Sequence, residues 1–211
     1  MVKKGISNEN PPSVSGPRSP VDYLNRAQVQ RLTQSFEIWK DSAPNSYIRR
    51  VRGRYWLVYL YLRFTGARLG EILRIDDSTD IDYRLHQIKV TIEGPSSIKK
   101  VLRMIPVPED LILQVIEYLS EFPGMRGNVF ALDQGNFRRE FYKRAEEADI
   151  PRHLSHPHIL RHTRAIEMIE AGVPLTMVRD LLGHSLLSTT TVYLQKTEIT
   201  SIVILKQKGL L

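Results

Sequence analysis

The stretch RYWLVYLYLRF, residues 54–64, constrains the fold more than any other feature, because it is almost continuously apolar. A segment of this length and character is typical of a helix buried in a protein core. Thr65-Gly66 follows it and supplies the left-handed residue that commonly ends a helix. Residues 25–40 form a second helical pattern, which begins at Asn25, a good N-cap. We therefore expect the ordered domain to begin near Asn25 with two helices.

The period of the apolar residues changes in residues 87–108. QIKVTIE and KVLRMIPVP alternate in hydrophobicity and are separated by GPSSIK, which predicts an antiparallel hairpin. Five further segments have helical spacing or helix caps: residues 109–122, 134–150, 156–172, 174–184 and 188–196. The β-branched residues 199–206 predict a possible C-terminal strand. The expected fold is mainly α-helical with a small antiparallel β-sheet.

Composition narrows the class of protein. The 211 residues are 42% hydrophobic and 25% charged, which is typical of a soluble globular protein. The sequence contains no cysteine, which excludes disulfides and thiolate zinc sites. We find no apolar run long enough to span a membrane and expect a cytoplasmic protein. Residues 1–24 are crowded with Pro, Ser, Gly and Asn and predict a flexible basic arm or linker, followed by one domain over residues 25–211.

The net charge of +7 is localised in the N-terminal part of the chain. Its densest point is IRRVRGR, residues 48–54, which contains Arg49, Arg50, Arg52 and Arg54. Clustered arginines attract a nucleic-acid backbone through Coulomb attraction and counterion release. The stretch therefore predicts contacts with DNA phosphates, although a solvated basic face would have the same composition.

Histidines and arginines gather in HPHILRHTRA, residues 156–165. His158 and Arg161 are three residues apart, so on a helix they share a face and can contact one ligand. His158 and His162 have a spacing that could also bind a metal, but no glutamate lies between them and Arg161 would repel a cation. A metallohydrolase is therefore a remote alternative. A lone histidine here would more simply be a core residue.

Three segments together resemble the signature boxes of the tyrosine recombinase, or phage integrase, family. They are FTGARLGEIL (64–73), HPHILRHTRA (156–165) and LLGHSLLSTTTVY (181–193), in the family's order and at similar separations. The resemblance covers roughly residues 25–195. It implies a catalytic domain that binds double-stranded DNA, and cleaves and rejoins strands through a 3′-phosphotyrosine intermediate.

The resemblance also implies roles for individual residues. Arg68, His158, Arg161 and His184 would surround the scissile phosphate, with Tyr193 as nucleophile. Two guanidiniums can neutralise the nonbridging oxygens of a phosphodiester, so no metal or other cofactor is expected. Glu71 would orient Arg68 rather than act as an acid. The family's leaving-group lysine is out of register in EGPSSIKK, residues 93–100, where Lys100 is preferred over Lys99. Lys99 and Arg103 are expected to contact DNA.

Two departures from the family leave alternatives open. Most members carry a helical domain ahead of the catalytic one, whereas this sequence has only a short arm. A non-recombining DNA-binding transcriptional regulator on the same fold, or a fragment of a longer ligand-sensing protein, is therefore the alternative. The apolar tail, residues 199–211, could exchange between copies on DNA and give a homo-oligomer, or could pair with the domain's own sheet. We expect the protein at the nucleoid.

Overall fold

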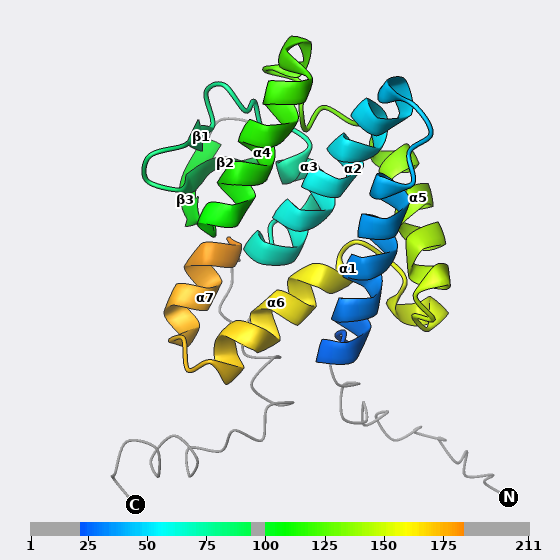
Figure 1. The fold of residues 1–211 in the computed structure, drawn as a ribbon. Helices are drawn as coiled ribbons and strands as arrows, with labels where there is room; N and C mark the ends of the chain where they lie inside the picture. The colour runs from blue at the N-terminus through cyan, green and yellow to red at the C-terminus, as the bar shows by residue number, and fades with distance from the viewer. Residues whose placement is uncertain (1–21, 94–99, 184–211) are drawn as a thin grey trace, which may run out of the picture.

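The chain folds into a helical body with a small sheet at one side (Figure 1). A computed structural model describes residues 22–93 and 100–183. The α-helices in that part of the chain are α1 (Arg26–Asp41), α2 (Ser46–Thr65), α3 (Leu69–Ile72), α4 (Glu109–Glu121), α5 (Gln134–Glu147), α6 (Ile159–Glu170) and α7 (Leu175–Leu182). The strands are β1 (Ile81–Asp82), β2 (Gln87–Glu93) and β3 (Lys100–Pro106). Short 3-10 turns lie at Pro123–Met125 and Arg152–Leu154.

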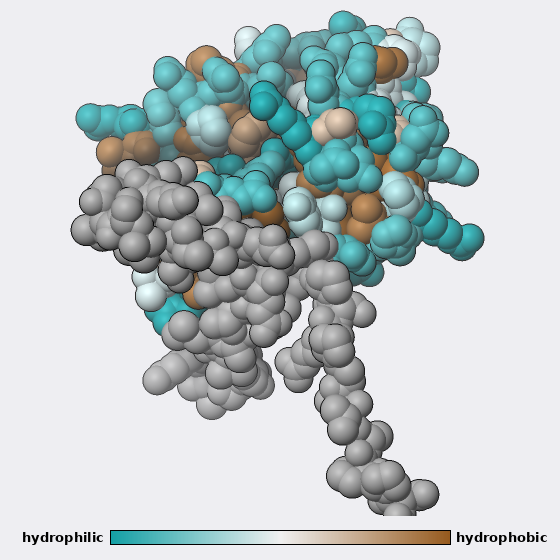
Figure 2. Space-filling view, turned by 90° about the horizontal axis from the view of Figure 1, so that it is seen from below, coloured by the Kyte–Doolittle hydropathy of each residue, from teal (hydrophilic) through white to brown (hydrophobic). Residues whose placement is uncertain are grey.

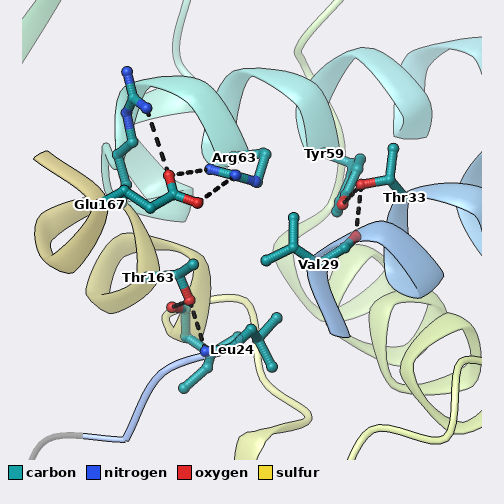
Figure 3. A network of polar contacts seen from close by, with 9 residues as sticks. Leu24, Val29, Thr33, Tyr59, Arg63, Thr163 and Glu167 are labelled. Carbon is teal, nitrogen blue, oxygen red and sulfur yellow. Dashed lines mark hydrogen bonds and ion pairs between the residues drawn. The ribbon is translucent and has the colours of Figure 1, made fainter. Parts of the chain in front are cut away.

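Helix α2 is the centre of the core, as its apolar stretch predicts. Every residue from Trp56 to Leu62 is buried, and α1, α4 and α6 pack around the helix. Tyr59 stacks on Phe36 of α1 with ring centroids 4.2 Å apart, and the Tyr59 hydroxyl pairs with Thr33 (Figure 3). Tyr55, Tyr59 and Tyr61 of this helix therefore serve packing.

The helix ends confirm the capping signals. Asn25 caps α1 by accepting a hydrogen bond from the backbone N–H of Gln28, whose side chain accepts from the Asn25 N–H in return. Gly66 ends α2 with φ +64°, the left-handed conformation that glycine adopts without strain. Leu24, just before the cap, is buried, and its N–H donates to Thr163 of α6. The described fold thus includes residues immediately ahead of Asn25.

The predicted hairpin is confirmed. β2 pairs antiparallel with β3, with Val90 opposite Arg103, and β1 adds a short third strand to give the order β1-β2-β3. Burial alternates along β3, so that Arg103 and Ile105 face the core while Leu102 and Met104 are exposed. The predicted helix 188–196, the predicted strand 199–206 and residues 1–21 lie outside the described residues.

One face of the described part is mainly polar. Seen from below the view of Figure 1, hydrophilic residues dominate and apolar ones form small separate patches (Figure 2). No helix among residues 22–93 and 100–183 is long and apolar enough to cross a membrane. The apolar residues Trp56 to Leu62 of α2 are buried in the core.

Candidate active site

The turn between α2 and α3 presents Arg68. Thr65 donates its hydroxyl to the Tyr61 carbonyl and accepts from the Ala67 N–H (3.1 Å), while Gly66 turns the chain out of the helix. Arg68 then occupies the N-cap position of α3 with its side chain 45% exposed. The Thr-Gly pair therefore places an exposed guanidinium directly after a buried helix.

Glu71 is the buried partner of Arg68. Its side chain is only 4% exposed, and its carboxylate accepts from the Arg68 N–H (2.7 Å) and from Arg68 Nη1 (3.1 Å). Burial alone would raise the pKa of Glu71, but the charge of Arg103 and the bonds from both arginines lower it below its ordinary value. Glu71 is therefore an ionised support for Arg68, as expected.

Helix α6 brings Arg161 to the same turn. Arg161 Nη1 donates to the Gly66 carbonyl at 2.9 Å, a contact between residues 95 positions apart in the chain. Arg161 itself is buried, at 2% exposure. The bond places the second predicted guanidinium on the turn that carries the first.

Two polar contacts hold α6 in that position (Figure 3). Arg63 of α2 donates both Nη groups to the Glu167 carboxylate, at 2.8 Å for Nη1 and Oε2. One turn nearer the start of α6, Thr163 accepts the Leu24 N–H at 3.0 Å. Thr163 and Glu167 lie two and six residues after Arg161 on α6, so these contacts tie the helix that carries Arg161 to α2 and to the segment ahead of α1.

The end of α7 meets the same turn. A Cβ atom added to Gly66 would lie 2.6 Å from Leu182 Cδ2, so the leucine packs directly on the glycine. Gly183 ends α7 with φ +71°. The described parts of all three signature segments therefore converge at Gly66. His184 and Tyr193, the remaining residues of the third segment, lie outside the described residues.

His158 stands at the N-terminal end of α6 and is exposed. Its ring meets that of His162 edge to face, with centroids 4.6 Å apart. Desolvation by its surroundings, followed by the nearby charges of Arg161, His156 and Arg68, lowers the pKa of His158 to about 4. Arg68 and Arg161 thus both act electrostatically on this imidazole, which is neutral at physiological pH.

The alternative of a metal site needs a third ligand beside His158 and His162. Among residues 22–93 and 100–183, no group of three or more His, Asp or Glu side chains is arranged to hold a metal ion. His158 and His162 contact each other through their rings. Burial, followed by the charge of His158, lowers the pKa of His162 to about 4. The described site thus consists of guanidinium and imidazole groups together with the Glu71 carboxylate.

Each of the four arginines in the predicted basic stretch, residues 48–54, contacts a different partner within the protein. Arg54 donates to three backbone carbonyls of the loop after α4, and Arg52 donates to the Trp39 carbonyl and stacks on its ring. Arg49 pairs with Glu121 at 2.9 Å, and Arg50 lies over the Tyr47 ring. All four lie in the N-terminal half of α2, whereas Arg68 follows its C-terminal end. Their phosphate contacts stay a prediction.

Three predicted site residues, Lys99, Lys100 and Arg103, belong to the hairpin. Arg103 was expected to contact DNA, but its side chain is 8% exposed and bonds to Glu71. Lys99 lies outside the described residues. Lys100 begins β3 opposite Glu93, and the structure describes only its backbone. Sequence reasoning missed the link from Arg103 to Glu71, although the alternation of β3 places Arg103 in phase with the buried Ile105.

The fold is that of integrase and recombinase catalytic domains: the catalytic domain of bacteriophage HP1 integrase superimposes with a TM-score of 0.58 at 23% identity, over 87% of this chain and 94% of that one. The chain belongs to the phage integrase family, whose model matches residues 22–199.

Two proteins that are similar to this chain are recombinases. The tyrosine recombinase XerC of Rickettsia canadensis is 32% identical over 160 residues, which cover 72% of this chain and 50% of XerC. The crystal structure of the XerH site-specific recombinase bound to its difH substrate has a TM-score of 0.66 at 21% identity, over 85% of this chain and 51% of XerH. The chain thus spans about half the length of these two relatives. Neither supports the alternative of a transcriptional regulator.

Proposed function

We propose that this chain cleaves and rejoins double-stranded DNA at specific sites, as a tyrosine-type recombinase. Membership of the phage integrase family supports the proposal, as does the similarity to XerC and XerH. The single observation that carries it is the bond from Arg161 Nη1 to the Gly66 carbonyl. This bond brings Arg161 to the turn that carries Arg68, and two guanidiniums at one place can stabilise the charge that develops on a reacting phosphate.

In the proposed reaction, the Tyr193 oxygen attacks the phosphorus of one strand. The bond from phosphorus to the 5′ oxygen breaks, and a proton passes to that oxygen, with Lys100 as the preferred donor. Arg68, Arg161 and His184 would stabilise the charge on the nonbridging oxygens. Attack by a side chain conserves the phosphodiester as a phosphotyrosine, so that reversal rejoins the strand without another energy source.

His158 is the proposed base for Tyr193. A pKa of about 4 keeps its imidazole neutral, and only the neutral ring can accept the phenol proton. A bound phosphate would raise that pKa, because an anion nearby favours the protonated ring. DNA binding would therefore strengthen the base at the step that uses it.

Arg161 sets one condition on the proposal. Because it is 2% exposed, DNA binding must uncover an edge of its guanidinium before a phosphate can contact it. Arg68, at 45% exposure, needs no such change. Phosphate would therefore reach the two arginines in sequence, Arg68 first.

A nicked-duplex assay tests the proposal. Sites bound by the protein are first selected from random duplexes, and a nick near the scissile phosphate then traps the covalent intermediate. The wild-type chain should form a DNA–protein adduct, whereas Tyr193→Phe should bind the same site without one. Tyr142→Phe, at an exposed position on α5, is the matched control and should form the adduct. Specific binding by the wild-type chain with no adduct on any nicked site would refute the proposal.

Two further parts of the proposal concern assembly and location. We infer that copies of the chain assemble on DNA through the apolar tail, residues 199–211, and that the protein works at the nucleoid. A sedimentation experiment with and without a selected site tests the assembly. Removal of residues 199–211 should leave binding of one copy intact and abolish the larger complex.

A further inference from the structure

We propose that Arg103 is a positioning residue, which fixes the orientation of Arg68 through their shared partner Glu71. The proposal rests on the proposed function for its catalytic part. Glu71 accepts from both arginines: Oε2 takes the Arg68 N–H (2.7 Å) and Arg103 Nη2 (2.8 Å), and Oε1 takes Arg68 Nη1 (3.1 Å) and Arg103 Nη1 (3.3 Å). One carboxylate thus joins an exposed arginine to a buried one.

A gain in stability does not explain why Arg103 is buried. Replacing a buried ion pair by apolar residues is often neutral or stabilising, because taking two charges out of water is costly. In the described part of the chain Arg103 Nε has no hydrogen-bond partner, so the guanidinium is committed to Glu71 through its two Nη groups. Apolar residues at both positions 71 and 103 would avoid the cost of burying the two charges. The pair is explained by the geometry it imposes.

The fork of Arg103 fixes the Glu71 carboxylate in a way that Arg68 alone cannot. Two parallel N–H donors set both the position and the plane of a carboxylate. Arg103 lies in β3, paired with Val90 of β2, so it is anchored in the sheet. Glu71 lies in α3, a helix of only four residues that has little stability of its own. The sheet therefore supplies the rigidity, and Arg103 transmits it to the turn that carries Arg68.

The same link joins two parts of the proposed site. β3 begins at Lys100, the preferred leaving-group donor, and reaches Arg103 three residues later. A displacement of β3 would move the start of the strand together with Glu71 and hence Arg68. The pair thus couples the position of the hairpin to that of the arginine.

Adduct formation at saturating DNA, measured separately from DNA affinity, tests the proposal. Arg103→Met should slow adduct formation by about 10²-fold, the effect of a misplacement of roughly 1 Å, and should change the Kd less than about threefold. Arg103→Lys keeps the charge but loses the fork and should be intermediate. Arg138→Met, on the exposed surface of α5, is the matched control and should behave as wild type. A weakened Kd with a lower salt slope would instead make Arg103 a phosphate contact and overturn the proposal.

A double-mutant cycle separates positioning from a general structural role. Arg68→Ala should slow adduct formation, and adding Arg103→Met should slow it no further, because Arg103 acts only through Arg68. Independent, multiplying effects would refute the route through Arg68. If Arg103→Met folds poorly, the pair Glu71→Leu with Arg103→Met replaces both charges by apolar groups. It should keep the unfolding midpoint near that of wild type and still be slow.

Hydrogen exchange gives a readout that does not depend on activity. The Arg68 amide is bonded to Glu71, so Arg103→Met should speed its exchange several-fold, while Arg138→Met should not. If the wild-type chain forms no adduct, the proposed function fails, but this exchange result still decides whether Arg103 holds the turn. Unchanged exchange at Arg68 would overturn the proposal by itself.

Discussion

Gly66→Ala is the substitution that most directly tests the convergence of the three signature segments. Two costs can be worked out from the structure. Gly66 has φ +64°, where an alanine loses about 1–2 kcal/mol. Its Cβ would also lie 2.6 Å from Leu182 Cδ2 and 3.3 Å from Arg164 Cβ, and overpacking of this kind costs about 1–3 kcal/mol. The expected loss of unfolding free energy is therefore about 2–5 kcal/mol in total.

Two other glycines separate these costs. Gly172 has φ +80° with open space where a Cβ would be, so Gly172→Ala should show only the conformational cost of about 1–2 kcal/mol. Gly70, in α3, has neither a positive φ nor a near neighbour, and Gly70→Ala should be neutral or stabilising by up to about 1 kcal/mol. Urea denaturation of the three variants at one pH gives the comparison.

The difference between Gly66→Ala and Gly172→Ala is the decisive quantity. If Gly66→Ala costs no more than Gly172→Ala, then Leu182 does not pack on the turn, and the reasoning that brings α7 to Arg68 is refuted. As a cross-check, Leu182→Ala removes the clashing group. Its effect combined with Gly66→Ala should be smaller than the sum of the two single effects, because the two residues are in contact.

Two further predictions concern charge. Arg54→Ala should lower the unfolding free energy by about 1.5–3 kcal/mol, because it breaks charge-assisted bonds to a loop, whereas Arg50→Ala should cost less than about 1 kcal/mol; urea denaturation distinguishes them. If Arg50 meets a phosphate, Arg50→Ala should also reduce the salt slope of DNA binding by about one unit, and an unchanged slope would make it a solvated surface residue. The pKa of His158 and that of His162 are lowered from 6.5 to about 4, so between these values the unfolded chain binds protons that the folded chain does not. Stability should therefore fall as pH decreases from about 6.5 to about 4, and His162→Gln should flatten that dependence in urea midpoints measured across the range; an equal slope in the variant would contradict the assignment.

Local signals predicted most of the fold. The cap at Asn25, the left-handed stop at Gly66 and the alternation of residues 87–108 each depend on neighbours close in sequence, and each is confirmed. The apolar run of α2 likewise required a buried helix. The DNA contact predicted for Arg103 stays a prediction, but its burial against Glu71 was not foreseen. Its alternation with buried residues was the signal for a core position.

Local patterns in the chain specify which segments are helical, where the turns lie and which cationic and imidazole groups are available, because these depend on short-range backbone and side-chain preferences. Which of those groups meet depends on how the helices and the sheet pack together. Arg161 contacts the carbonyl of Gly66, and Arg103 is buried against Glu71 instead of facing solvent. Such partners are chosen by packing across long separations in the chain, where one carbonyl or one carboxylate satisfies a buried charge that local sequence preferences cannot place.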